Sequence, residues 1–249
     1  HARELGLKGI TNSVEDIIVA RDIMLSHDTG AKLHLCHCST EDSVMMVDLA
    51  KQKNVKVTAE VCPHHFTLTS DDIRKIAPEM DVEKNVIAAD ADADTNFKMN
   101  PPLRDKADRE ALLEGLADGT IDMIATDHAP HSAEEKSRGL EKSAMGIVGL
   151  ETAFPLLYTH LVKPGVISFA RLMELLHDAP CRRFGIAPDT GFTVFDLNRT
   201  YPIDPAEFLS MGRATPFAGW SVQGRCLLTA TGEGAVWCDE ERLLRGERL

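Results

Sequence analysis

Histidine and aspartate side chains stand where three short apolar segments of the chain end. They are His37 at the end of residues 33–38, His64 and His65 after residues 55–62, and the run Thr126-Asp-His-Ala-Pro-His131 at the end of residues 121–126. Imidazole and carboxylate groups together suit a zinc-type ion. If the three segments are neighbouring parallel strands, these groups meet at their carboxyl ends, where α/β barrels place their active sites.

Each of these residues also has an ordinary structural interpretation. A single histidine at a strand end is more often a capped polar group than a metal ligand, and an aspartate that begins a helix is usually its N-cap. The run from Thr126 to His131 is harder to explain in this way, because it concentrates two imidazoles and a carboxylate at one strand end. His64 and His65 would point in opposite directions in an extended chain, so we expect at most one of them to face the site.

The elements that position these residues are predicted to alternate between helix and strand. Ser13-Val-Glu-Asp16 resembles a capping box and is followed by apolar residues at helical spacing. Ser39 and Thr40 are suited to cap a second helix, and residues 108–116 are predicted to form a third. The predicted strands are residues 33–38, 55–62 and 121–126. This order predicts a parallel sheet with right-handed crossovers.

The alternation stops after residue 126. Helices are predicted at residues 149–162 and 168–184, and short β segments at residues 193–197, 220–222 and 226–231. The polar stretch 69–104 is long for a structureless loop, so we expect a lid, a binding loop or an insertion there. Three parallel strands cannot close a barrel, and alone they would expose an unpaired edge and a broad apolar face.

The composition is that of an ordinary globular protein. Of the 249 residues, 43% are hydrophobic and 27% are charged. No apolar run reaches the roughly 18 residues of a membrane span, so we expect no membrane association. The net charge of −12 argues against nucleic acid as a partner. Six cysteines without a CxxC pair indicate reduced thiols and a cytoplasmic location.

Between Glu79 and Asp94 the chain carries six acidic residues and one lysine. A solvated acidic loop is the ordinary interpretation of such a run. A calcium loop is excluded, because Asp90-Ala-Asp-Ala-Asp lacks the turn glycine and the closing glutamate.

A series of short motifs runs through nearly the whole chain in a definite order. The motifs are His37-Cys-Ser-Thr40, Ala59-Glu-Val-Cys-Pro-His-His65, Lys98-Met-Asn-Pro-Pro-Leu-Arg104, Thr126-Asp-His-Ala-Pro-His131, Glu135-Lys136, Gly146-Ile-Val-Gly-Leu-Glu-Thr-Ala153 and Thr215-Pro-Phe-Ala-Gly-Trp220 with Gly224-Arg225. Together, in wording and order, they resemble class I dihydroorotases of the amidohydrolase superfamily.

The resemblance implies an α/β fold. Residues 1–190 would be the C-terminal part of a (β/α)8 TIM-type metal-dependent hydrolase barrel, about strands 6 to 8, and residues 191–249 a small β-rich segment of a composite β domain. It also implies a binuclear Zn²⁺ centre and the reversible cyclisation of N-carbamoyl-L-aspartate to L-dihydroorotate in de novo pyrimidine biosynthesis.

Carried over residue by residue, the resemblance assigns roles to six positions. His37 matches the zinc-binding histidine of the sixth strand, and Asp127 matches the zinc ligand of the eighth strand that also acts as general base. Asn100 and His131 match residues that bind substrate. Met145 and Gly146 fall where the family binds substrate through a Phe-Gly or similar pair. Methionine there is a departure, and it is mild if backbone groups make the contact.

Several features of the family have no match in this chain. They are the His-x-His pair and the substrate arginine of the first strand, a further substrate asparagine, the bridging aspartate or carboxylated lysine of the fourth strand, and the zinc histidine of the fifth. Two matched ligands cannot fill two zinc shells, so we expect the chain alone to be inactive. The sequence leaves open whether the chain is a fragment or a true short form. A homodimer and an association with aspartate transcarbamoylase are both compatible with the resemblance.

Two other functions compete with this one. Another cyclic amidohydrolase, of the dihydropyrimidinase or allantoinase type, would share the fold and the metals, but the Thr126–His131 and Lys98–Arg104 wording favours dihydroorotase. A non-catalytic dihydroorotase-like subunit that supports aspartate transcarbamoylase would have lost ligands. The presence of His37, Asn100, Asp127 and His131 together argues against it, because a scaffold has no reason to keep them.

Overall fold

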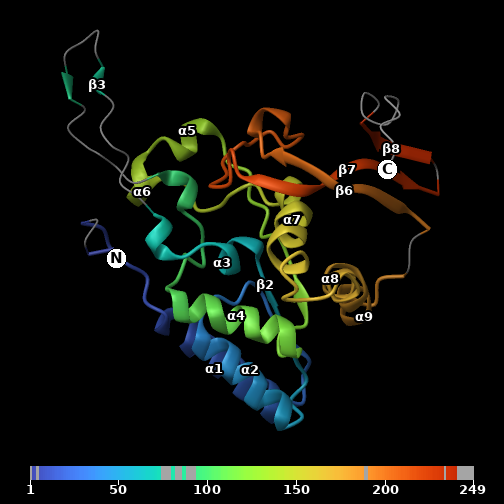
Figure 1. The fold of residues 1–249 in the computed structure, drawn as a ribbon. Coiled ribbons are helices and arrows are strands. Elements are labelled where there is room, and N and C mark those ends of the chain that lie inside the picture. The colour runs from blue at the N-terminus through green and yellow to red at the C-terminus, as the bar shows by residue number, and fades with distance from the viewer. Residues whose placement is uncertain are drawn as a thin grey trace. The chain divides into compact units, whose positions relative to one another are not determined.

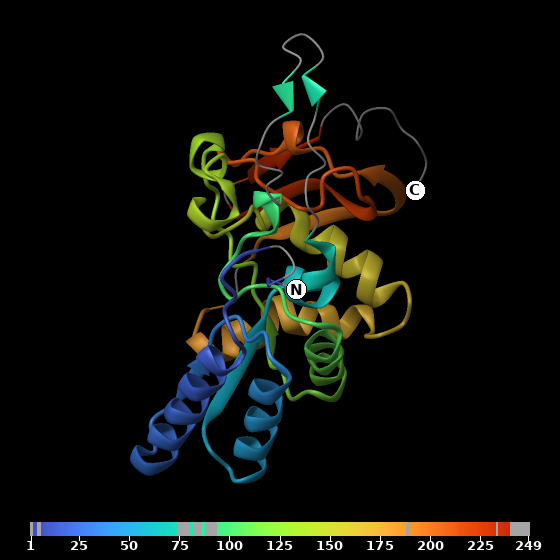
Figure 2. The same cartoon turned by 90° about the vertical axis from the view of Figure 1, so that its left-hand side faces the viewer.

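The computed structural model describes residues 2–3, 6–73, 80–81, 86–87, 94–187, 190–232 and 234–239. Most of the acidic run between Glu79 and Asp94 therefore lies outside the described residues. The chain divides into two compact units, His1–Glu151 with Pro205–Pro216, and Thr152–Asp204 with Phe217–Leu249. Figures 1 and 2 show the chain in two views.

The first unit is built on a three-stranded parallel sheet. Its strands are β1 (Leu33–Leu35), β2 (Val57–Val61) and β5 (Met123–Ile124), in the order β1-β2-β5. Leu33 pairs with Val57, and Val61 pairs with Ile124. The sequence prediction of a parallel sheet from these three segments is confirmed, although each strand is shorter than predicted. The carboxyl ends of β1 and β5 lead directly into His37 and Asp127.

Three helices pack around this sheet (Figure 2), and their ends follow the capping signals in the sequence. They are α1 (Ser13–Thr29), α2 (Glu41–Gln52) and α4 (Lys106–Asp118). The side chain of Thr40 caps α2 by accepting a hydrogen bond from the Ser43 amide. Gly119 ends α4 with φ 95°. The expected capping box at Ser13 is wrong: the N-cap of α1 is Asn12, and its side chain makes no capping bond.

The core of the first unit lies between the sheet and these helices. Val47 on α2, Leu112 on α4 and Val61 on β2 are fully buried. Gly115 allows the close approach of α4, since a Cβ there would lie 3.1 Å from Cγ1 of Val44 on α2.

Shorter elements carry the loops beyond the strand ends. They are α3 (Pro63–Thr67), the 3-10 turns Ser70–Asp72, Thr95–Phe97 and Pro205–Glu207, the antiparallel pair β3 (Met80–Asp81) and β4 (Val86–Ile87), α5 (Ala133–Lys136) and α6 (Gly139–Lys142). The polar stretch predicted as a lid or insertion thus contains short elements of its own.

The second unit combines helices with an antiparallel sheet. Its helical elements are α7 (Leu150–Leu157, which begins in the first unit), a π-helical turn Tyr158–Val162, α8 (Phe169–Met173), a second π turn Glu174–Asp178 and α9 (Ala179–Phe184). The sheet consists of β6 (Phe192–Pro202), β7 (Ser221–Thr231) and β8 (Gly234–Cys238). Phe154 on α7 stacks on Phe195 of β6 with ring centroids 3.6 Å apart. The two β segments predicted at residues 220–222 and 226–231 form the single strand β7, and β8 was not predicted.

Within the described ranges, no helix has the length and apolarity needed to cross a membrane.

Candidate metal centre and substrate site

His37 and Asp127 share an unusual backbone conformation. Among the described residues, three that are not glycine have a positive φ: His37 at 41°, Asn54 at 58° and Asp127 at 46°. Asn54 lies in the turn between α2 and β2, where asparagine tolerates this region well. The other two follow the ends of β1 and β5. Backbone strain of this kind persists where the surrounding structure enforces it, and it clusters at functional sites.

The backbone after His37 is tied down on both sides. The Cys38 amide donates to the Glu60 carbonyl at 2.9 Å, which extends the pairing of β1 with β2. The Ser39 amide donates to Oε1 of Glu15 on α1 at 2.8 Å, and the Ser39 hydroxyl donates to the other oxygen of the same carboxylate. These bonds hold the His37 backbone in its left-handed conformation.

The His37 ring has a free nitrogen that fits a metal ligand. Its Nδ1 is buried and has no hydrogen-bond partner among the described residues. A buried imidazole nitrogen normally has a partner, so an orphaned one calls for an explanation. Coordination of an ion would provide it.

Asp127 begins a segment that runs beside residues 147–150. The Ala129 amide donates to the Ile147 carbonyl at 2.9 Å. Nδ1 of His128 accepts from the Gly149 amide at 3.1 Å and from the Leu150 amide at 3.3 Å. His128 is therefore held by the first residues of α7, which is a structural role. Asp127 precedes it at the strand end.

The pKa values of nearby thiols show which groups surround Asp127. Burial is the main cause of the raised pKa of Cys36, and the charges of Glu60 and Asp127 raise it further. Burial also raises the pKa of Cys62, again with help from Asp127. The Asp127 carboxylate thus acts electrostatically on groups that follow β1 and β2.

Three of the four expected substrate residues are brought together. Nε2 of His131 lies 3.0 Å from the Met145 carbonyl oxygen. The Gly146 amide donates to the Lys98 carbonyl, two residues before Asn100, at 3.0 Å. Gly146 has φ 139°, and a Cβ there would lie 2.4 Å from the Cβ of Ala129. Only glycine fits at this position, which explains why the second residue of the Met145-Gly146 pair is a glycine.

Opposite directions for His64 and His65 were expected only in an extended chain, and the chain is not extended there. Pro63 begins the short helix α3, and both rings are buried, at 2% and 3% exposure. Their ring centroids are 4.2 Å apart. Nε2 of His65 bonds to the Pro101 carbonyl at 2.9 Å. Burial lowers the pKa of His65 to about 4 and that of His64 well below its usual value, so both rings are neutral near pH 7.

Two groups of three side chains among the described residues could hold a metal ion. One is Cys62, His64 and His65, and the other is His34, Cys36 and Glu60, each with its donor atoms within 4.8 Å of one another. Neither group contains His37 or Asp127, the ligands that the resemblance assigns.

The His34 group is already occupied by internal hydrogen bonds. The two ring nitrogens of His34 lie 2.9 Å from Oγ1 of Thr58 and 2.9 Å from Oε2 of Glu60. The sequence reasoning did not select either group. The close spacing in Cys62-Pro-His-His65 was its only local signal, whereas the second group requires knowledge of strand register.

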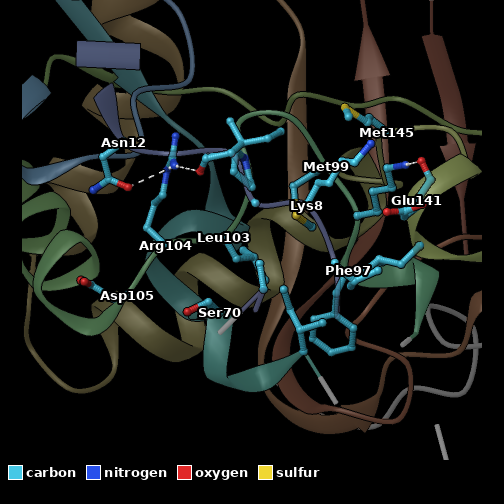
Figure 3. Close-up of a pocket in the computed structure, with 18 of the residues that line it drawn as sticks. Lys8, Asn12, Ser70, Phe97, Met99, Leu103, Arg104, Asp105, Glu141 and Met145 are labelled. Atoms are coloured by element: carbon cyan, nitrogen blue, oxygen red, sulfur yellow. Dashed lines mark hydrogen bonds between the residues drawn. The ribbon is translucent and has the colours of Figure 1, made fainter. Parts of the chain in front are cut away.

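A cavity of about 610 Å³ lies in the first unit, between the N-terminal segment and the Lys98–Arg104 motif. Figure 3 shows Arg104 beside Asn12 on one side of this cavity and Met145 with Glu141 on the other. Arg104 is buried and donates to the Ile10 carbonyl, to Oδ1 of Asn12 and to the Ser39 hydroxyl. Met145 lines the cavity, whereas Asn100, His131 and Gly146 are not among its lining residues.

The chain is similar in sequence to dihydroorotases. No protein-family model matches the chain. A dihydroorotase of Bacillus cytotoxicus is 47% identical over 248 residues, covering 96% of this chain and 54% of its own length. A dihydroorotase of Bacillus anthracis is also 47% identical, over 246 residues, with the same coverage.

Solved structures of related enzymes share the fold. The L-hydantoinase (dihydropyrimidinase) of Arthrobacter aurescens superposes with a TM-score of 0.76 at 29% identity, over 89% of this chain and 48% of its own. The dihydropyrimidinase of Brevibacillus agri superposes with a TM-score of 0.78 at 22% identity, over 92% of this chain and 50% of its own.

The chain spans about half the length of the curated relatives that it matches. The alignment covers 96% of this chain. The chain is a homologue of the dihydroorotases.

Proposed function

We propose that the chain forms part of a dihydroorotase, which interconverts N-carbamoyl-L-aspartate and L-dihydroorotate in the cytoplasm. The observation that carries the proposal is that His37 and Asp127 combine strained backbone with positions after β1 and β5. The 47% identity to dihydroorotases over 96% of the chain supports it.

The fold of the complete enzyme is part of the proposal. Residues 1–190 would supply about three strands of a (β/α)8 barrel and residues 191–249 part of a β domain. The barrel would bring the carboxyl ends of further strands to the site, and these would supply the remaining metal ligands.

The residues present fit a zinc centre. His37 and Asp127 would hold zinc, because the Nδ1 of His37 is a buried nitrogen without a partner and Asp127 follows a neighbouring part of the same sheet. Zinc, when bound, would lower the pKa of water to about 7 and polarise the carbonyl that is attacked.

The chain's own side chains would handle the proton and the substrate. The Asp127 carboxylate would accept the proton released on attack and deliver it to the leaving ring nitrogen. Asn100, His131 and the Met145-Gly146 backbone would bind the substrate carboxylate and ring, so that binding places the reacting carbonyl.

The hydantoinase neighbours favour a second candidate substrate class, cyclic amides such as dihydrouracil or hydantoin. The sequence comparison favours dihydroorotate, because the chain is 47% identical to proteins named dihydroorotase, a higher identity than to the hydantoinase. A supporting subunit of aspartate transcarbamoylase is the third candidate.

The proposal is tested by zinc-supplemented assays of L-dihydroorotate, dihydrouracil, hydantoin and allantoin. We expect no turnover by the chain alone, and turnover of dihydroorotate once the preceding half of a Bacillus relative is added. Asp127→Asn should abolish that activity, and Lys53→Met, at an exposed position away from the cavity, should leave it unchanged. Normal turnover by the chain alone would contradict the expected dependence on missing ligands. Turnover of hydantoin without dihydroorotate would assign the second class.

A further inference from the structure

Lys136 is a buried lysine that the proposed mechanism does not use. It is the last residue of α5 and is 5% exposed. Its ammonium group donates to three backbone carbonyls, those of Lys98 at 3.2 Å, Ala144 at 3.1 Å and Gly146 at 3.0 Å. An ammonium group has three protons and no acceptor, so the three carbonyls satisfy it completely.

These three carbonyls belong to the segments that carry the expected substrate residues. Lys98 lies two positions before Asn100, while Ala144 and Gly146 flank Met145. The Lys98 carbonyl also accepts from the Gly146 amide at 3.0 Å, so it is shared between the two segments. The Met145 carbonyl, between the two that Lys136 binds, is 3.0 Å from the His131 ring.

Charged neighbours do not explain why a lysine is buried here. Among the described residues, no carboxylate forms an ion pair with Lys136. The Glu135 carboxylate accepts instead from the Ser132 amide at 2.9 Å and from its hydroxyl at 3.0 Å. Burial of an ammonium group is costly unless it is well hydrogen-bonded. The three carbonyls are therefore what stabilises the Lys136 ammonium group in its buried position.

We propose that Lys136 is a positioning residue, whose ammonium group fixes the Asn100 segment against the Met145-Gly146 segment. The pair of segments would then present the Asn100 side chain and the 145–146 backbone at a constant spacing. A neutral apolar side chain would leave the Ala144 and Gly146 carbonyls without this donor. Among the hydrogen bonds of the described residues, the one from the Gly146 amide to the Lys98 carbonyl would then remain between the two segments. The inference rests on the proposed function only for the ligand that these segments bind.

The test is amide hydrogen exchange in the whole chain, read at the Gly146 amide. Lys136→Met keeps an unbranched side chain, one atom shorter, and removes all three donors. We expect about tenfold faster exchange at Gly146, the size of one lost hydrogen-bond contribution. Lys53→Met, at an exposed lysine that does not line the cavity, is the control and should leave the rate unchanged. The Leu33 and Ala125 amides, which bond to the Lys56 and Val61 carbonyls in the sheet, should be unaffected in both variants.

A pH profile of the unmodified chain gives a second measurement that needs no variant. Burial and the charge of Lys98 lower the pKa of Lys136 to about 8, while Asp94 raises it. Exchange at Gly146, corrected for the intrinsic effect of pH on amides, should therefore accelerate as the pH rises through about 8. Lys136→Met should abolish this dependence.

Equal exchange at Gly146 in Lys136→Met and the unmodified chain would overturn the proposal. An equal acceleration at Leu33 and Ala125 would assign Lys136 to general stability and would also overturn it. With the preceding half of a Bacillus relative present to supply the missing ligands, added L-dihydroorotate should slow exchange at Gly146. If it does not while the other arms behave as expected, the positioning role stands and the proposed substrate is wrong.

Discussion

At the scale of single residues, His37 and Asp127 stand out because both have a positive φ without being glycine. A glycine or an asparagine would adopt a positive φ with less strain. Histidine and aspartate are themselves enriched among non-glycine residues with a positive φ, so the backbone alone does not select them over asparagine. The observation that points to side-chain chemistry is the buried Nδ1 of His37, which has no hydrogen-bond partner among the described residues. The sequence could identify both residues, because each follows an apolar strand. It could not show the strain, which depends on contacts such as those between Ser39 and Glu15.

We therefore expect Asp127→Asn to leave the fold intact. Asparagine is at home in the left-handed region, so the free energy of unfolding should change by less than about 0.5 kcal/mol. Urea denaturation measures this directly. Asn54→Ala is the matched comparison, because alanine at φ 58° should destabilise the chain by about 1 kcal/mol. A large loss of stability in Asp127→Asn would mean that Asp127 has a structural role.

His64 and His65 follow the predicted strand 55–62. Opposite directions were expected for them only in an extended chain, whereas proline is favoured at the first position of a helix. The helix that begins there places both rings in the interior. Their burial follows from tertiary packing against residues such as Pro101, and no spacing rule in the sequence contains that information.

These two buried rings predict a loss of stability in mild acid. The pKa of each is lowered in the folded state, to about 4 for His65, so the unfolded chain binds more protons than the folded one below about pH 6.5. The free energy of unfolding should therefore fall as the pH drops from 6.5 toward 4, by at most about 1.4 kcal/mol per pH unit for each ring.

Denaturation at a series of pH values tests this prediction. His65→Gln should reduce the slope, whereas His177→Gln, at an exposed histidine, should not. A slope unchanged by His65→Gln would show that His65 is protonated as readily in the folded chain as in the unfolded one.

At the scale of elements, the parts predicted from sequence are those whose signals are local. Helix α4 has a good N-cap, apolar periodicity and a terminal glycine, and it forms as predicted with slightly wider bounds. Strand β2 has clean alternation and a burial pattern that matches it. Strand β8 was missed, because its side chains are mostly exposed and its pairing with β7 is the main thing that defines it.

The N-cap of α4 should contribute measurably to stability. Oδ1 of Asp105 accepts from the Ala107 amide at 2.9 Å and the Asp108 amide at 3.1 Å. Asp105→Ala should lower the free energy of unfolding by about 1 kcal/mol. Glu110→Ala, which removes only an exposed ion pair with Lys106, should cost less than about 0.5 kcal/mol. Equal effects of the two substitutions would show that the cap contributes nothing beyond surface charge.

At the scale of the whole molecule, helix α1 was predicted correctly but its environment is unusual. Its apolar residues recur at helical spacing, and yet they are exposed: Val14, Ile17, Ile18, Met24 and Leu25. A stripe at that spacing is ordinarily buried against the rest of the protein. Periodicity reports that a face is apolar, but a covering partner has to be found elsewhere.

An exposed stripe of this kind should make the chain bind apolar dyes and associate at high concentration. Ile17→Glu combined with Met24→Glu should lower both 8-anilinonaphthalene-1-sulfonate fluorescence and the sedimentation-average mass. The stability should change little, because both side chains are already exposed. Val47→Glu at a buried position is the contrasting variant and should unfold the chain. Dye binding unaffected by the double substitution would place the apolar surface elsewhere.

Two buried cysteines beside the candidate site allow local opening of the site to be measured. Cys38 follows His37 and is 1% exposed, and Cys62 precedes the two buried histidines and is 0% exposed. Burial raises the pKa of both thiols well above the usual value, so they are poor nucleophiles in the closed chain. A thiol reagent can modify them only when the ends of β1 and β2 separate from their surroundings. Their alkylation rate therefore measures local opening beside the proposed metal ligand His37, and an ion bound there should lower that rate.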